Sequence, residues 1–150
     1  MTKIVRTNSA NSDFLILVRK LDAELAIRDG DDHEFYSQFN SLDKIRHVVL
    51  AYADGEPAGC GAIKEYSSGT MEVKRMFVLH GHRRKGIAAK ILAELERWAA
   101  ELSVRRCILE TGKKQPEAIE LYKKNGYLPI ANYGQYAGVE NSVCFEKILP

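Results

Sequence analysis

The chain has 150 residues, of which 45% are hydrophobic and 28% are charged, a balance typical of one globular domain over residues 1–150. Its 22 basic and 20 acidic side chains leave a net charge of +2, too even for a dedicated nucleic-acid or membrane-surface binder. We expect no secretory signal and no membrane span, because no apolar run approaches about 18 residues. Three cysteines, each beside an apolar residue, favour reduced thiols in a cytoplasmic protein.

The first half of the chain predicts strands and a long helix. Leu17, Leu21 and Leu25 recur at four-residue steps, so residues 12–29 predict a helix with Ser12 as its N-cap. The other elements expected in this half are a shorter helix over residues 33–45 and strands over residues 3–7, 47–53, 58–66 and 70–79.

The second half alternates strands and helices. An apolar stripe predicts a helix over residues 86–102. Pro116 and Gly126 mark the first turn and the end of another helix over residues 116–125. Further strands are expected over residues 106–110, 127–130 and 142–148.

This order of elements, β-α-α-β-β-β-α-β-α-β-β, predicts an α+β fold with antiparallel central hairpins. The strand–helix–strand segment near residues 70–110 should be a crossover that joins parallel neighbours. Gly59 and Gly61, inside one predicted strand, indicate a bulge or a close backbone approach.

The most informative segment joins a strand to a helix through a basic loop, residues 78–89. Backbone N–H groups at the start of a helix lack partners and the helix dipole adds positive charge, so the segment predicts an anion site, typically for phosphate. Gly86 and Ala88 let phosphate approach the backbone, and three basic residues before Gly86 attract it. A solvated loop before a packed helix explains the composition equally well, and the pattern is neither a Walker loop nor a Rossmann fingerprint.

Three segments, in order, resemble the GNAT N-acetyltransferase superfamily. Residues 83–88, Arg-Arg-Lys-Gly-Ile-Ala, are similar to its Arg/Gln-x-x-Gly-x-Gly/Ala motif. Residues 71–78 are similar to the strand before that motif, and residues 118–127 to the Ala-x-x-Leu-Tyr-x-x-x-Gly-Phe/Tyr signature after it. The resemblance covers residues 70–130, whereas residues 1–69 fit only in the order of their elements.

The resemblance implies a single GNAT-like domain with a central mixed, mostly antiparallel sheet of six to seven strands and about four helices. It implies acetyl-CoA as the acyl donor. In this family the fourth and fifth strands splay apart to admit the pantetheine arm, and backbone N–H groups, here those of residues 84–88, hold the pyrophosphate. The residues that it assigns to the cofactor are Met76, Phe77, Val78, Arg83, Arg84, Lys85, Gly86, Ile87, Ala88 and Gln115, the last where the family often has Asn.

Acyl transfer to an amine needs a neutral nucleophile, so a base is expected. Glu72 is the candidate, directly or through water, because strand alternation places it on one face with Lys74, Met76 and Val78 beside the expected pantetheine arm. A salt bridge with a neighbouring Lys or Arg is the structural alternative. Backbone N–H groups around Phe77 and Val78 are expected to stabilise the oxyanion.

Tyr122 falls on the family's tyrosine near the thioester sulfur and is the candidate acid that protonates the departing thiolate. A core tyrosine on an amphipathic helix is the alternative. Cys60, Cys107 and Cys144 lie in predicted strands with no His within two residues, so we expect small buried hydrophobes rather than acyl-carrying nucleophiles. No His, Cys or carboxylate spacing suggests a metal site.

By the resemblance, the first helices and the final hairpin loop line the acceptor site. Tyr133 and Tyr136 in that loop offer flat surfaces and polar contacts. A small amine or an amino acid is the expected acceptor, with a protein lysine or N-terminus as the alternative. The first region either attracts an amine or is a solvated helix face, and its acidic residues are Asp22, Glu24, Asp29, Asp31 and Asp32.

The leading hypothesis is therefore an acetyl-CoA-dependent N-acetyltransferase with no nucleic-acid or membrane partner. A non-catalytic acyl-CoA sensor on the same fold is the first alternative, and the presence of Glu72 and Tyr122 argues against it. A nucleic-acid module built on residues 80–85 is the second, and the balanced charge argues against it. The oligomeric state stays open, a homodimer included.

Overall fold

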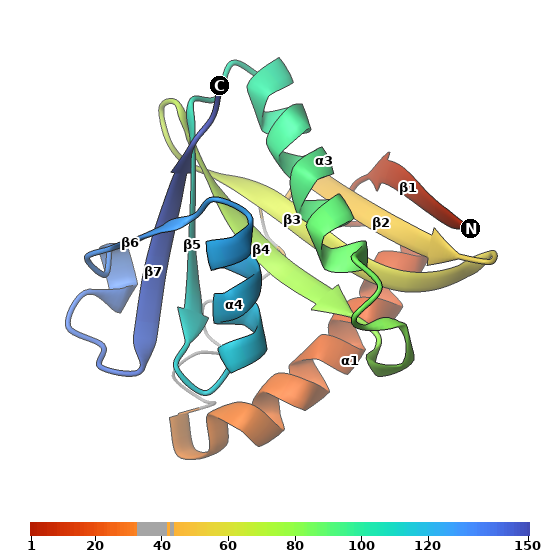
Figure 1. Cartoon of the computed structure of the whole chain (residues 1–150), viewed down its shortest axis with the longest axis horizontal. Helices are drawn as coiled ribbons and strands as arrows, with labels where there is room; N and C mark the ends of the chain where they lie inside the picture. The colour runs from red at the N-terminus through yellow and green to blue at the C-terminus, as the bar shows by residue number, and fades with distance from the viewer. Residues whose placement is uncertain (33–41, 43) are drawn as a thin grey trace.

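The computed structural model describes residues 1–32, 42 and 44–150, which form one seven-stranded sheet with helices on both faces (Figure 1). The strand order is β1-β2-β3-β4-β5-β7-β6. The strands are β1 Thr2–Thr7, β2 His47–Ala53, β3 Glu56–Ser67, β4 Thr70–Val78, β5 Arg106–Gly112, β6 Leu128–Ile130 and β7 Ser142–Ile148. The helices are α1 Ser12–Asp29, α3 Ile87–Glu101 and α4 Pro116–Lys124, with short 3-10 turns η1 Gly30–Asp32, η2 His80–His82 and η3 Gly134–Tyr136.

The sheet is mixed, as predicted. Its neighbouring strands run antiparallel except for β4 and β5, which are parallel and joined by the crossover through α3. The predicted α+β class and the order of the described elements are confirmed. The second predicted helix, residues 33–45, lies almost wholly outside the described residues and stays a prediction.

Local sequence sets most helix ends. Helix α1 is capped by Asn11, whose Oδ1 accepts from the backbone N–H of Asp13 at 2.8 Å and of Phe14 at 3.1 Å. The prediction of Ser12 as N-cap is wrong, because the amide oxygen of the preceding residue already reaches these free N–H groups and Ser12 begins the first turn. Helix α4 starts at Pro116 and is followed by a glycine of positive φ, as predicted.

Two hydrophobic cores lie on opposite faces of the sheet. On one face, Ile91 and Leu95 of α3 and Tyr122 of α4 pack against the strands. On the other, Phe14 and Leu17 of α1 pack against β2 and β3. We call these the α3/α4 face and the α1 face, and the site depends on which side chains reach each one.

A bulge in β4 changes which of its side chains share a face. Phe77 pairs with Cys60, but Lys74 pairs with Ala62, so Gly61 alone faces Arg75 and Met76, and Arg75 takes a φ of 59°. Its consequence is a switch of side-chain alternation within the strand. Strand β4 therefore carries two groups of side chains rather than one continuous row.

The predicted common face of Glu72, Lys74, Met76 and Val78 is wrong because of this bulge. Met76 and Val78 pack in the α3/α4 core, together with Val73. Since Glu72 and Lys74 alternate with Val73 before the bulge, they point to the α1 face. A strand without the bulge would have kept the predicted alternation.

Gly59 and Gly61 mark the close approach that the sequence indicated. A Cβ on Gly61 would lie 2.5 Å from Met76 Sδ and 2.9 Å from Ile91 Cγ2. A Cβ on Gly59 would lie 2.9 Å from the Phe77 carbonyl oxygen. The absence of side chains on β3 therefore lets β4 and α3 pack onto it.

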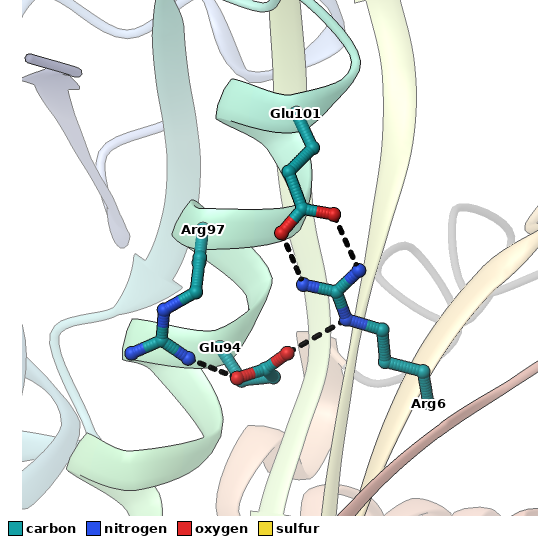
Figure 2. A network of polar contacts seen from close by, with 4 residues as sticks. All are labelled: Arg6, Glu94, Arg97 and Glu101. Atoms are coloured by element: carbon teal, nitrogen blue, oxygen red, sulfur yellow. Dashed lines mark hydrogen bonds and ion pairs between the residues drawn. The ribbon is translucent and has the colours of Figure 1, made fainter.

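A partly exposed ionic cluster holds the edge strand β1 to α3 (Figure 2). Arg6 Nε lies 2.7 Å from Glu94, and the two terminal nitrogens donate to Glu101 at 2.7 and 2.8 Å. Arg97 pairs with the other oxygen of Glu94, and the Arg6 guanidinium lies 4.9 Å from the Trp98 ring centroid. This cluster joins two elements far apart in sequence.

A second, less exposed cluster holds the other side of α3. Lys147 Nζ of β7 donates to Glu96 at 2.8 Å and to the Asn125 carbonyl at 2.9 Å. The Tyr127 hydroxyl donates to the other oxygen of Glu96 at 3.0 Å. These contacts join α3, the end of α4 and β7.

The structure also bears on the predictions made for the three cysteines and for membrane-spanning segments. Cys60, Cys107 and Cys144 are free and fully buried, as predicted for small hydrophobic residues. In the described part of the chain, no helix combines the length and the apolar character that crossing a membrane requires.

Candidate active site

The site is an opening in the sheet between β4 and β5. The two strands pair only from Thr70 to Glu72 on β4 and from Arg106 to Ile108 on β5, and beyond these residues they part. The splayed strands implied by the resemblance are thus present. The pocket at the opening is lined by Leu21, Leu25, Asp29, Glu72, Val73, Lys74, Arg75, Met76, Glu110, Thr111, Gly112, Gln115, Ala118, Tyr122 and Tyr136.

The pocket brings together part of the predicted site. Glu72, Met76, Gln115 and Tyr122 all line it, although they come from β4 and from α4 with its N-cap. The predicted phosphate loop, residues 83–88, lies apart from this pocket, where α3 begins. In the structure the predicted residues therefore fall into two groups, and β4 connects them.

Glu72 is buried on the α1 face, with a relative exposure of 5%. Its Oε2 accepts a hydrogen bond from the Tyr133 hydroxyl at 2.6 Å, and its Oε1 lies 3.9 Å from Lys74 Nζ. Burial lowers the pKa of Lys74, while the carboxylate of Glu72 opposes that shift. Glu72 thus both lines the pocket and takes part in the ion pair that was its structural alternative.

Tyr122 reaches the pocket from the other face of the sheet. It packs in the α3/α4 core at 6% exposure, with its ring 5.8 Å from that of Tyr127. Burial, and then the charge of Glu110, raise the pKa of Tyr122 well above its usual value, so the hydroxyl keeps its proton at neutral pH. Tyr122 is therefore a core residue and a pocket residue at once.

Glu110 is a pocket residue that the sequence analysis missed. Burial raises its pKa to about 7, against a hydrogen bond from Ser142 and the charge of Lys74, which favour the ionised form. Ser142 Oγ donates to Glu110 Oε2 at 2.7 Å. No local motif marks Glu110: its one signal is a carboxyl that follows three apolar residues of a strand.

The loop before α3 has the geometry of an anion site. Arg84 and Gly86 take φ values of 66° and 78°, and the N-cap of α3 carries no side-chain hydrogen bond. A loop that alternates in this way turns successive backbone N–H groups toward one concave side. A Cβ on Gly86 would meet nothing within 4 Å, and Arg84 and Lys85 are exposed. The residues present therefore fit a diphosphate.

Arg83 differs from its basic neighbours, because its guanidinium is held within the protein. Nε donates to the Val78 carbonyl at 2.7 Å, and one terminal nitrogen donates to both oxygens of Glu24 at 2.9 and 3.0 Å. The guanidinium also lies 5.6 Å from the Phe77 ring centroid. Arg83 thus fixes the loop to β4 and α1, and its predicted part in binding the cofactor stays a prediction.

The acidic residues of α1 divide between structure and pocket. Asp22 accepts from buried Arg75 at 2.5 Å, and Glu24 is held by Arg83. Asp29, by contrast, is buried and lines the pocket. The region is therefore neither a plain solvated face nor a set of free carboxylates.

The final loop reaches the pocket, and its expected part in lining an acceptor site stays a prediction. The Tyr133 hydroxyl reaches Glu72, and Tyr136 lines the pocket at 3% exposure. Asn132 Nδ2 donates to the carbonyls of Val139 and Ser142 at 3.0 and 3.1 Å, which holds the loop in its bend.

The mixed seven-stranded sheet and the parting of β4 from β5 agree with the fold that the resemblance implied. A family model described as the Acetyltransferase (GNAT) family matches residues 15–127. The chain therefore belongs to the GNAT acetyltransferase family and is an N-acetyltransferase.

Its relatives include an IAA acetyltransferase from Azospirillum brasilense, 32% identical over 149 residues, which cover 97% of each chain. The uncharacterized N-acetyltransferase YsnE of Bacillus subtilis is 34% identical over 114 residues, or 72% of this chain and 76% of the relative. Both similarities extend beyond the segments that carry the motifs.

Among solved structures, one from Klebsiella pneumoniae assigned to the acyl-CoA N-acyltransferases has a TM-score of 0.84 and 29% identity, over 100% of this chain and 99% of that one. The PaiA N-acetyltransferase of Thermoplasma acidophilum, solved in complex with coenzyme A, has a TM-score of 0.73 and 16% identity over 99% of both chains. The second likeness shows a shared fold.

Proposed function

We propose that this enzyme transfers the acetyl group of acetyl-CoA to the primary amine of a small molecule or an amino acid, by direct attack while both are bound. The observation that carries this proposal is the opening between β4 and β5, which joins Tyr122 on one face to Glu72 on the other. A thioester and an amine that enter from opposite faces would meet there without a covalent enzyme intermediate.

Two elements would hold the donor. The backbone N–H groups of residues 84–88 would bind its pyrophosphate at the start of α3, with exposed Arg84 and Lys85 adding attraction. The edge of β4 from Met76 to Val78, left without a strand partner where β5 parts from it, would bind the pantetheine arm as an added strand. When bound, acetyl-CoA supplies an activated acyl group with a thiolate leaving group.

The pocket residues would then transfer protons and stabilise the charge that develops during the reaction. Tyr122 keeps its proton at neutral pH and would give it to the departing sulfur. Backbone N–H groups around Phe77 and Val78 would stabilise the charge on the carbonyl oxygen. Glu72 is the acid–base group that the sequence offers for the amine, directly or through water, and Glu110 is a second carboxyl in the same pocket.

The final loop favours a small acceptor. Because the Tyr133 hydroxyl bonds Glu72 and Tyr136 also lines the pocket, both tyrosines would contact an acceptor on this side, which suits a small molecule. The pocket also contains Lys74 and Arg75 beside its carboxyls, a mixture of charges that suits an amino acid.

The test is thiol release from acetyl-CoA with a mixed panel of small amines, amino acids and lysine peptides. Thermal-shift screening of the same panel in the presence of coenzyme A identifies binders, because a ligand of the native state raises Tm. We expect turnover with at least one small amine. Binding of coenzyme A without thiol release for any amine would instead indicate a non-catalytic acyl-CoA module.

A further inference from the structure

Two carboxyl groups stand on the α1 face of the sheet, one on each strand of the opening. Glu72 is the last β4 residue in register with β5, where it pairs with Ile108. Leu109 belongs to the α3/α4 core, so Ile108 and Glu110 on either side of it point to the face that Glu72 occupies. Both carboxyls line the pocket, and the charge of Glu72 contributes to raising the pKa of Glu110.

The two carboxyls differ in what already holds them. Glu72 has the Tyr133 hydroxyl on one oxygen at 2.6 Å and Lys74 Nζ at 3.9 Å from the other. Glu110 has Ser142 Oγ on Oε2 at 2.7 Å, and among the described residues no hydrogen bond reaches its Oε1. An oxygen without a donor is the one that can receive a proton from an approaching ammonium group.

We propose that Glu110 is the group that accepts the proton of the acceptor's ammonium group, and that Glu72, fixed by Tyr133, positions that ammonium group. The inference rests on the proposed function. It assigns to two residues the role toward the amine that the sequence analysis assigned to Glu72 alone. It accounts for a half-buried carboxyl beside the opening that has no ion-pair partner within 4.0 Å in the described chain.

The proposed reaction removes two protons from the nitrogen and replaces a carbon–sulfur bond with a carbon–nitrogen bond. An ammonium group loses two protons when it becomes an amide nitrogen. The first passes to Glu110 and leaves the nitrogen neutral, so that a carbon–nitrogen bond forms and the carbon–sulfur bond breaks. The sulfur takes a proton from the Tyr122 hydroxyl, and the second proton of the nitrogen restores Tyr122. Glu110 returns its proton to solvent, which leaves one proton released per turnover.

The titration of Glu110 supports this geometry, since a base works best when its pKa lies near the working pH. Burial places the pKa of Glu110 at about 7, where an ordinary glutamate would already be ionised. The titratable and charged groups around Glu110 come from β4, β7, α1, α4 and η3 and are Glu72, Lys74, Cys144, Asp29, Tyr122 and Tyr136.

The experiment compares kcat/KM against pH for the wild-type enzyme, Glu110→Gln and Glu72→Gln, with an amine that the panel identifies as an acceptor. We expect wild-type kcat/KM to decrease at pH values below a midpoint near 7, which gives the pH profile an acidic limb. Glu110→Gln should lose about 10²-fold or more in kcat and lack that limb. Glu72→Gln, the matched substitution on the neighbouring strand, should raise KM for the amine and keep the limb.

Ser142→Ala keeps Glu110 and removes its hydrogen-bond donor. Because that bond favours the ionised carboxyl, its loss should move the midpoint to higher pH without abolishing turnover. Carbon-13 NMR of labelled glutamate carboxyls needs no acceptor. It should show one carboxyl titrating near pH 7 that is absent from Glu110→Gln and present in Glu72→Gln.

The contrary outcomes are distinct. A Glu110→Gln enzyme with the kcat and pH profile of the wild type, or a Glu72→Gln enzyme that alone loses the limb, would overturn the assignment of Glu110. A wild-type enzyme that turns over none of the amines would overturn the proposed function instead. Equal binding of coenzyme A by all variants shows that each is folded.

Discussion

At the scale of single residues, the site is built from side chains that also belong to the core. Tyr122 packs in the α3/α4 core yet reaches the opening between β4 and β5. Glu110 is partly removed from water by the same packing that forms the pocket, and this desolvation raises its pKa. Burial thus sets the proton chemistry of the site as well as its stability.

Tyr122→Phe should lower kcat by about 10²-fold, because it removes the proposed proton donor and keeps the packed ring. The affinity for coenzyme A, measured by calorimetry, should stay unchanged. Tyr127→Phe is the matched control, since Tyr127 is a neighbouring buried tyrosine whose hydroxyl bonds Glu96 outside the pocket. It should cost stability and leave kcat alone. Equal kcat for Tyr122→Phe and wild type would remove the acid role.

Glu110 should also make stability depend on pH. The folded state keeps its proton up to about pH 7, whereas an ordinary glutamate loses it near 4.5, so the unfolded state binds fewer protons between these values. The free energy of unfolding should therefore fall as pH rises from about 5 to 7, relative to Glu110→Gln, by about 2–3 kcal/mol. Urea titrations at a series of pH values measure it.

The control for this linkage is Glu65→Gln, which changes an exposed glutamate of β3. This variant should keep the pH slope of the wild type. Parallel curves for wild type and Glu110→Gln across the same window would show that the Glu110 carboxyl is hydrated in solution.

At the scale of elements, the bulge in β4 decides where the site residues point. It leaves Glu72 and Lys74 on the α1 face and turns Met76 into the opposite core. The glycine opposite the bulge, Gly61, makes room for Met76 and for α3. The strand and the helix therefore depend on one residue without a side chain.

Gly61→Ala should destabilise the fold by about 1–3 kcal/mol, because its new methyl group would overlap Met76 and Ile91. Chemical denaturation measures the loss. Gly81→Ala is the control, since a Cβ there meets nothing within 4 Å and its φ is not positive, so its effect should be small. Met76→Ala added to Gly61→Ala should recover part of the lost stability if the overlap with Met76 dominates. No recovery would show that the overlap with Ile91 dominates.

At the scale of the whole molecule, two ionic clusters hold α3 to distant strands. In the Arg6 cluster, which joins α3 to β1, Glu101 is 53% exposed, whereas Glu96, which joins α3 to β7 and Tyr127, is 14% exposed. Charged pairs in contact with solvent contribute little to stability, whereas hydrogen bonds to a half-buried charge contribute more. The two clusters should therefore contribute unequally to the free energy of unfolding.

Glu96→Gln should lower the free energy of unfolding by about 2 kcal/mol, since Lys147 and Tyr127 both lose a charged acceptor. Glu101→Gln, the same change on the same helix, removes the exposed partner of Arg6 and should have a much smaller effect that vanishes in high salt. Thermal unfolding at low and high ionic strength measures both. A larger loss for Glu101→Gln would reverse this order of importance.

The order of the described elements and the loop that begins α3 could be predicted from local sequence. The strands, the helix ends at Pro116 and Gly126, and the glycine loop at the start of α3 depend on residues within a turn or two of one another. Backbone preferences and side-chain periodicity act over that range, so they can be read along the chain. The family motifs lie in these same segments.

Only the tertiary structure decided the rest. Tyr133 donates a hydrogen bond to Glu72 across 61 residues of sequence, and Arg83 donates one to Glu24 across 59. No local pattern predicts either contact. The bulge at Arg75 and the partial burial of Glu110 arise from how neighbouring strands and helices pack. A carboxyl's proton affinity depends on the water and charges around it, and these are set by segments that meet only when the chain has folded.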